Sequence, residues 1–431
     1  MSACANVAAA SLEAYESTRA HLRETPLEDA GWLRSAIAKR QAAAGVASSA
    51  ADAGRGDGAA PTPPPPPLPP PPPPAAVYLK LESEQRSGSF KARGALNAVL
   101  RALRDDDDDD GGGGGGGDGA GRRITGFTTA STGNHALAMV QAVTAAAACA
   151  RQRQQPPPPP LELRIFVAEN ADPTKLARLR AAASASADSG ARCSVVVGGR
   201  DCCEAEVAAR AAAATSATTR YISPYNDADV IAGQGSLAVE LLSQLRGGGG
   251  GGGGGADKDD DDDSLPPMAV LIPVGGGGLC AGVASVLRAA LGQRCAIYGC
   301  QPAANDVMRR SVAAGELLLD LPEVAEAPTL SDATAGGVER GSLTFSLCST
   351  LVDRWIAVSE GEIADAMVST LQHGGKLVEG AAACAVAAAL RVAREAPEEL
   401  AGRRVVVIAC GGNVGVAALR EALERGRAVE I

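Results

Sequence analysis

The stretch VYLKLESEQRSGSFKARGALNAV, from Val77 to Val99, decides the fold because it contains one complete strand–turn–helix unit. Residues 77–82 predict a β-strand, a Ser/Gly turn follows, and residues 90–103 predict a helix. Lys91 lies just inside this helix, where the positive end of the helix dipole lowers the pKa of an amine and favours its nucleophilic form. On position alone, the simpler interpretation of Lys91 is a solvent-exposed helix lysine.

The same alternation of strand and helix continues along the chain. Seven further apolar runs predict strands, at residues 124–130, 161–168, 193–197, 268–274, 295–300, 354–358 and 404–409. Repeated alternation is typical of an α/β fold with parallel sheets flanked by helices. Ligands bind beyond the carboxyl ends of such strands, so the turns that follow strands are the candidate sites. The 431 residues allow two domains, or one domain with large insertions.

Composition narrows the possible partners. The net charge is -10, but two aspartate runs, 105–110 and 259–263, carry more than that charge. The rest of the chain is therefore nearly neutral, and we expect no nucleic-acid or membrane partner. Four low-complexity tracts are predicted to be flexible surface insertions that fall between elements. They cover residues 61–74, 105–119, 156–160 and 247–263.

The eleven cysteines include the pair Cys202–Cys203 and show no CxxC pattern. No apolar signal segment precedes them, so we expect a reduced, intracellular protein. No stretch has the length and continuous apolarity of a membrane span. The sequence favours the cytoplasm and leaves a short organellar signal open.

LESEQRSGSFKARGA, residues 81–95, resembles the lysine motif of the fold-type-II pyridoxal-phosphate enzymes. In that family the lysine forms a Schiff base with the cofactor. The resemblance therefore implies that Lys91 carries pyridoxal 5'-phosphate and that Phe90 flanks its ring. It also implies two domains built on parallel-type twisted sheets, as in the tryptophan synthase β-subunit.

TTASTGNHALAM, residues 128–139, places hydroxyl groups and backbone N–H groups at the start of a predicted helix. Such a helix start is a natural carboxylate site, although Ser131 and Asn134 could equally be a helix cap and a turn residue. The segment is similar to the family's Ser-Ser-Gly-Asn-His motif, which implies that Asn134 bonds the ring hydroxyl of the cofactor. The residues implied for the substrate carboxylate are Ser131, Thr132, Gly133 and His135.

VLIPVGGGGLCAGV, residues 270–283, contains a glycine run between an apolar strand and an amphipathic helix. Consecutive glycines there can turn several N–H groups toward one phosphate. The glycine runs at 111–117 and 247–255 lack such flanking elements and are interpreted as low-complexity insertions without a binding role. The motif resembles the family's tetraglycine phosphate cup, formed here by Gly275, Gly276, Gly277 and Gly278.

VVVIACGGNVG, residues 405–415, places Cys410 at the end of a predicted strand. A buried thiol there is usually inert packing. In the resembling family a Ser or Cys at this place bonds the pyridine nitrogen, and a neutral partner favours elimination over transamination. The resemblance also places Glu379, in LVEGAAACAVAAAL, near the ring.

LSDATAGGVERGSLTFSL, residues 330–347, resembles the serine/threonine dehydratase (threonine ammonia-lyase) branch, without its C-terminal regulatory domain. This resemblance implies elimination of water from L-threonine or L-serine, with Lys91 and Thr132 as catalytic residues. Residues 1–124 and 226–431 would form a larger cofactor-binding domain, and residues 125–225 a smaller domain that closes over the substrate. A homodimer is usual in this branch.

Three alternatives remain on the same fold. Serine racemases carry Ser where Thr132 stands and metal ligands where this chain has Gln301 and Val307, so racemization is expected at most as a side activity and no metal site is expected. β-Replacement synthases usually lack the histidine found at His135. A catalytically retired cofactor-binding protein is disfavoured because Lys91, Asn134 and Cys410 are all retained.

Overall fold

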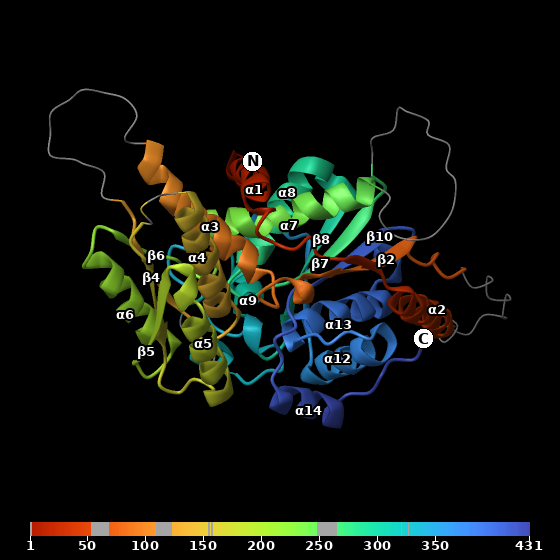
Figure 1. The fold of residues 1–431 in the computed structure, drawn as a ribbon. Coiled ribbons are helices and arrows are strands. Elements are labelled where there is room, and N and C mark those ends of the chain that lie inside the picture. Colours follow the sequence, from red (N-terminus) through yellow and green to blue (C-terminus); the bar gives the residue numbers. More distant parts are fainter. Residues whose placement is uncertain are drawn as a thin grey trace, which may run out of the picture.

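A computed structural model describes residues 2–52, 69–108, 123–153, 156, 158–247, 265–319, 321–325 and 327–431. Over these residues the chain forms two separate sheets, each with helices on its faces (Figure 1). The predicted α/β fold with two parallel-type sheets is therefore confirmed. Of the four low-complexity tracts, only residues 69–74, 105–108, 156, 158–160 and 247 are described. The rest of that prediction lies outside the described residues.

The larger unit contains a six-stranded sheet. Its strands, in spatial order, are β1 (Leu27–Asp29), β2 (Ala76–Leu81), β10 (Arg404–Ala409), β7 (Met268–Pro273), β8 (Cys295–Pro302) and β9 (Arg354–Val358). The short edge strand β1 is antiparallel to β2, and every other pair is parallel. All residues of β7 are buried, as a central parallel strand covered on both faces requires.

The smaller unit contains a four-stranded, fully parallel sheet. Its strands, in spatial order, are β5 (Ala191–Val197), β4 (Leu161–Val167), β3 (Gly126–Ala130) and β6 (Thr219–Tyr221). All four come from one continuous stretch of the chain. The chain then returns to the larger unit through α7.

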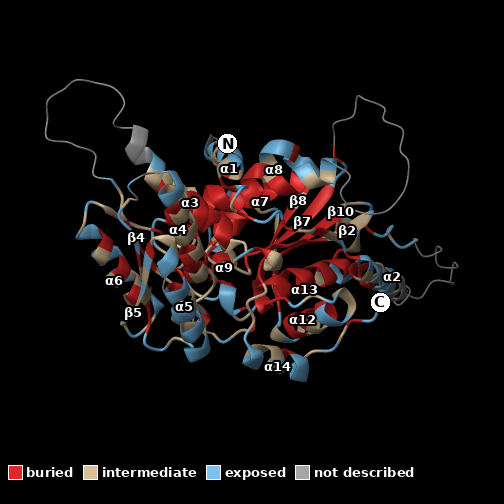
Figure 2. Cartoon of the chain, in the orientation of Figure 1, coloured by how far each residue is buried: buried red, intermediate tan, exposed pale blue. Residues whose placement is uncertain are grey.

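The helices fill the faces of both sheets. They are α1 (Ser2–Thr18), α2 (Gly31–Asp52), α3 (Lys91–Asp108), α4 (Asn134–Arg153), α5 (Pro173–Ala185), α6 (Cys202–Ala214), α7 (Ala228–Arg246), α8 (Gly278–Leu291), α9 (Val307–Ala314), α10 (Pro322–Ala325), α11 (Leu343–Leu351), α12 (Glu360–Gly374), α13 (Gly380–Glu395) and α14 (Val416–Arg425). Helix α13 packs on one face of the six-stranded sheet, while α7 and α8 lie on the other (Figure 1). In Figure 2 this interior is buried throughout. No described helix is long and apolar enough to cross a membrane.

Helix α3 is shared by the two units. Its residues Ala95 and Val99 belong to the hydrophobic core of the smaller unit, while the same helix contacts α7 of the larger one. Glycines allow the close approach to α7, because a Cβ atom on Gly233 would lie 2.6 Å from the Cα of Gly94. The predicted domain boundary at residue 124 assigns the whole of α3 to the larger unit and so leaves out its place in the second core. The division into two domains otherwise stays a prediction.

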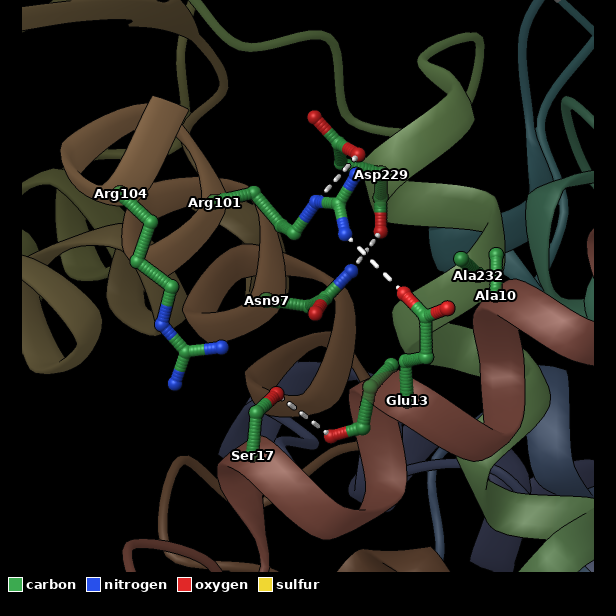
Figure 3. A pocket seen from close by; sticks show the side chains of 9 residues that line it. Ala10, Glu13, Ser17, Asn97, Arg101, Arg104, Asp229 and Ala232 are labelled. Carbon is green, nitrogen blue, oxygen red and sulfur yellow. Dashed lines mark hydrogen bonds and ion pairs between the residues drawn. The ribbon is translucent and has the colours of Figure 1, made fainter. Parts of the chain in front are cut away.

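Two polar contacts hold α3 against α1 and α7 around a small hollow (Figure 3). Asn97 donates through Nδ2 to the carbonyl oxygen of Asp229 at 2.8 Å. Arg101 pairs with Glu13 of α1 at 3.1 Å. The residues that line this hollow lie outside the predicted active site. The two polar contacts hold α3 against its neighbours.

A buried ion network fixes the first turn of α3 as well. Lys80 donates to Glu240 at 2.5 Å, and Arg93 pairs with both Glu82 and Glu240 at 2.8 Å. These four side chains are at most 5% exposed. The network contains two positive and two negative charges. This balance matters because burying an unpaired charge costs several kcal/mol of solvation free energy. Arg93 is two residues from Lys91, so the network positions that lysine's backbone.

The structure differs from the sequence prediction at element ends and at the N-terminus. The tract predicted to begin a loop at Asp105 starts inside α3, which continues to Asp108. A helix that has already formed extends at little cost per residue, so its end is poorly marked by composition. Helices α1 and α2 were not predicted, because their alanine-rich sequences show weak amphipathic periodicity.

Candidate active site

The predicted motifs meet where strands end. Lys91 follows β2, the Ser131–His135 segment follows β3, the glycine loop follows β7, and Cys410 follows β10. Strands β10 and β2 run parallel, with Ala409 opposite Leu81, so their carboxyl ends coincide. The N–H group of Phe90 donates to the carbonyl oxygen of Cys410 at 3.0 Å. This bond places the lysine turn directly against the Cys410 turn.

Lys91 is the first residue of α3 and is half-buried. Its Nζ donates to the carbonyl oxygen of Pro224 at 2.6 Å and lies 5.0 Å from the centroid of the Phe90 ring. Burial lowers the pKa of Lys91 to about 8, against the smaller opposing effects of Cys410 and Glu379. About a tenth of the amine is therefore unprotonated at pH 7 and about half at pH 8, far more than for an ordinary lysine, which suits a nucleophile or a base.

Asn134, Glu379 and Cys410 form one hydrogen-bonded group beside this lysine. Asn134 donates through Nδ2 to both carboxylate oxygens of Glu379, each at 3.0 Å. The Cys410 thiol lies 3.9 Å from Oε1 of the same carboxyl. Burial raises the pKa of Glu379 to about 7 and the pKa of Cys410 well above its usual range. Cys410 is therefore a neutral thiol at physiological pH.

The Ser131–Gly133 turn precedes α4, which begins at Asn134. The hydroxyl of Ser131 accepts a hydrogen bond from the N–H of Gly133 at 3.2 Å. Thr132 is half-buried and makes no hydrogen bond to another described residue. His135 is 2% exposed, and neither ring nitrogen has a hydrogen-bond partner of good geometry among the described residues, although the Ile222 backbone lies close enough to the ring to oppose the lowering of its pKa. Burial, followed by the Lys91 charge, lowers the pKa of His135 to about 3, so the ring is uncharged.

The glycine loop is packed too closely to accept side chains. A Cβ atom on Gly276 would lie 2.4 Å from the Tyr225 ring, and Gly277 has a φ of +89°, which favours glycine. No N–H group of Gly275–Gly278 donates a hydrogen bond to another group within the described ranges. These amides precede the body of α8, so they offer free donors at a positive helix end, as a phosphate site needs.

These residues fit pyridoxal phosphate on the structure alone. The glycine loop supplies unpaired N–H donors for a phosphate, and Lys91 supplies a partly neutral amine for an aldehyde. Cys410 supplies a neutral thiol, and His135 supplies two unpartnered ring nitrogens beside the lysine. The described residues contain no group of His, Cys, Asp and Glu side chains that could hold a metal ion. The individual roles, including the absence of a metal site, stay predictions.

Fold and site together define a two-sheet α/β enzyme that uses a lysine and a phosphate-bearing cofactor. Residues 58–411 match the profile of the family described as "Pyridoxal-phosphate dependent enzyme". The chain belongs to this family, and its cofactor is pyridoxal 5'-phosphate.

Among its relatives, an L-threonine ammonia-lyase of Geobacter sulfurreducens is 32% identical, over 81% of this chain and 70% of the relative. An L-threonine ammonia-lyase of Thermotoga maritima is 30% identical over the same shares of the two chains.

Solved structures share the fold at lower identity. Maize serine racemase superposes with a TM-score of 0.68 at 20% identity, covering 97% of this chain and 96% of the racemase. The processed form of threonine deaminase isoform 2 from Solanum lycopersicum superposes with a TM-score of 0.65 at 24% identity, covering 97% and 87%. At such identities the likeness concerns the fold, and both lyases and racemases use it.

Sequence reasoning missed several residues of this region. Tyr225 packs on Gly276, although the sequence assigned it no role. Asn413 donates to Oδ1 of Asn134 at 2.7 Å, and Arg178 of α5 donates to Asn413 at 2.7 Å. Asn413 stands inside the VVVIACGGNVG motif, which was the available signal. Arg178 has no such signal, because its contact joins distant parts of the chain.

Proposed function

We propose that this protein is an L-threonine and L-serine ammonia-lyase, which eliminates water to give 2-oxobutanoate or pyruvate together with ammonia. The observation that carries the proposal is Lys91, a half-buried amine with a pKa of about 8 held between the Phe90 ring and the Asn134–Glu379–Cys410 group. The relatives named L-threonine ammonia-lyase support the choice of reaction.

Lys91 serves as the base for the Cα proton of the amino acid. Its Nζ is already held within the site by the Pro224 carbonyl, so no diffusion of a base is needed. When bound, the cofactor supplies an electron sink for the pair left behind at Cα. The β-hydroxyl then leaves as water, with the proton that Lys91 removed from Cα balancing the lost hydroxide, and the unsaturated amine product takes up water to give the 2-oxo acid and ammonia.

The remaining residues bind and orient the substrate. The amides and hydroxyls of Ser131–Gly133 at the start of α4 receive the carboxylate, beside the uncharged His135. The free N–H groups of Gly275–Gly278 neutralise the phosphate. Thr132, which makes no hydrogen bond to another described residue, would move a proton at the substrate.

The neutral thiol of Cys410 supports elimination. A neutral partner leaves the pyridine nitrogen unprotonated, which moderates the electron sink and disfavours transamination. Its pKa is raised chiefly by burial and then by Glu379, so it does not ionise in the working range.

The test is absorbance of the purified holoenzyme, followed together with 2-oxo acid release after addition of L-threonine or L-serine. A cofactor absorbance band that is lost in Lys91→Ala, with oxo acid from either substrate, supports the proposal and ranks the substrates. A Lys91-dependent band without oxo acid would overturn it. Chiral analysis of the remaining serine would then detect a racemase, and an inert band would indicate a retired cofactor-binding protein.

We further propose that the enzyme acts in the cytoplasm as a homodimer, as its resemblance to the dehydratase branch implies. Light scattering coupled to size-exclusion chromatography tests the dimer, and imaging of the tagged full-length chain tests the location.

A further inference from the structure

Besides the Ser131–His135 segment, the smaller unit contacts the active site through one exposed arginine. Arg178 lies on α5, which packs on β5 and α4 of that unit. Its Nη2 donates to Oδ1 of Asn413 at 2.7 Å. Asn413 belongs to the loop after β10, in the larger unit. One turn earlier on α5, Lys175 pairs with Asp332, so two cations of one helix contact loops of the larger unit.

The arginine stands at the end of an unbroken chain of side chains. Asn413 donates through Nδ2 to the carbonyl oxygen of Ser87 at 2.9 Å and to Oδ1 of Asn134 at 2.7 Å. Asn134 in turn donates through Nδ2 to both oxygens of Glu379. Three links, made by four hydrogen bonds, thus connect a surface guanidinium on one unit to a buried carboxyl on the other.

The two ends of this chain fix the orientation of both amides. A guanidinium can only donate and an ionised carboxylate can only accept. Asn413 must therefore turn its oxygen toward Arg178, and Asn134 must turn its N–H group toward Glu379. If Asn134 turned over, its amide nitrogen would meet the donor of Asn413, and Asn413 could restore the bond only by turning its own donor toward Arg178.

Protonation of Glu379 would loosen one end of the chain, because a protonated carboxyl can donate as well as accept. Burial raises the pKa of this carboxyl to about 7. The groups that face it are the Asn134 amide, the backbone N–H group of Asn413, the Cys410 thiol, Asp332 with its partner Lys175, and the Lys91 amine. Near and below neutral pH the fixed polarity is then retained at Asn413, where the Arg178 guanidinium can only donate and the Ser87 carbonyl can only accept.

We propose that Arg178 is a positioning residue for this active site, which acts through Asn413 to hold the Asn134 amide in one orientation. The proposal rests on the assignment of the Lys91 site as the cofactor site. Because Arg178 belongs to the smaller unit, correct orientation of Asn134 also requires the two units to be in contact.

The test compares Arg178→Met, which keeps the apolar stem without a donor, with the conservative Arg178→Lys. Arg180→Met is the matched control, because Arg180 is exposed on the same helix and makes no hydrogen bond or ion pair to the described residues. The first readout is hydrogen exchange of peptides spanning residues 130–140 and 410–416, measured in the cofactor-free protein. The second is the pH profile of kcat/KM in the holoenzyme.

Arg178→Met is expected to speed exchange in both peptides and to lower kcat/KM roughly fivefold to tenfold, the usual scale for a charge-assisted hydrogen bond at a partly exposed site. The loss should be larger below about pH 7, where Glu379 is protonated, than above about pH 8. Arg178→Lys should recover most of it, and Arg180→Met should match the wild type.

Equal exchange and equal profiles for Arg178→Met and Arg180→Met would overturn the proposal. A loss that is uniform across pH and that Arg178→Lys does not rescue would also overturn it, because a merely structural role predicts that result. If Lys91→Ala retained turnover, the proposed function would fall. The exchange experiment would still decide whether Arg178 orders the Asn413 and Asn134 segments.

Discussion

Replacement of Glu379 by glutamine should stabilise the cofactor-free protein at alkaline pH and change its stability little at acidic pH. The carboxyl is 4% exposed, accepts two hydrogen bonds from Asn134, and has a pKa raised by burial to about 7. Glutamine keeps an acceptor for Asn134 and has nearly the same shape. The variant therefore removes the charge and, because an NH2 group replaces one acceptor oxygen, one of the two hydrogen bonds from Asn134.

The size and sign of the effect follow from the two pKa values. The folded pKa of Glu379 is about 7 against a reference of 4.5, a difference worth about 3 kcal/mol at ~1.4 kcal/mol per pKa unit. Because the folded value is raised, this stability is fully present below pH 4.5. It is lost as the pH rises through about 7, since the unfolded chain releases its proton first. Above that pH the buried charge costs the protein up to about 3 kcal/mol.

Urea unfolding of wild type and Glu379→Gln at about pH 5 and about pH 8.5 measures this difference. The variant should gain up to about 3 kcal/mol over wild type at the higher pH and about 1 kcal/mol at the lower. Glu398→Gln, at an exposed position, is the control and should show no such pH dependence. A difference between variant and wild type that is equal at both pH values would refute the reasoning, because it would show that burial does not perturb this carboxyl.

Three further outcomes are expected. Glu240→Gln should destabilise the fold by about 3–5 kcal/mol, because it leaves two buried cations with one carboxylate. Adding Lys80→Met to this variant should recover about 1–3 kcal/mol, and a double-mutant cycle measured by urea unfolding checks both values. Gly276→Ala, whose Cβ would lie 2.4 Å from the Tyr225 ring, should weaken cofactor binding roughly tenfold in an absorbance titration. The kcat of the wild type should rise with pH up to about 8, because the Lys91 amine must be unprotonated to act as a base. A kcat that stays constant as the pH falls below about 8 would contradict this role.

The sequence predicted the fold well because local patterns specify it. The apolar runs at 354–358 and 404–409 coincide with β9 and β10, and the run at 268–274 differs from β7 by one residue. The sequence also predicted the positions of Lys91 and the glycine loop, because both lie in turns after strands and within recognisable motifs. In these cases the information lies within about twenty residues of chain, which periodicity and turn chemistry can read.

The remaining features depend on pairing between distant residues. The sequence predicted Glu379 near the cofactor ring. Its hydrogen bond to Asn134 and its proximity to Cys410 are seen only in the folded structure. The ion pair between Lys80 and Glu240 joins residues 160 positions apart, and single charges on a strand and on a helix carry no sign of being buried together. Nothing in the sequence distinguishes exposed Arg178 from Arg180, although only Arg178 reaches Asn413 among the described residues.

Helix α3 explains why the site needs both units. Its first residue is Lys91, its Arg93 is held by carboxylates of the larger unit, and its Ala95 and Val99 pack in the core of the smaller one. A rotation of the smaller unit would therefore have to carry α3 with it or break that second core. Breaking the core would cost several kcal/mol of buried apolar surface. Carrying α3 would strain the balanced ion network at Arg93. Lys91 is thus expected to stay fixed between the two cores.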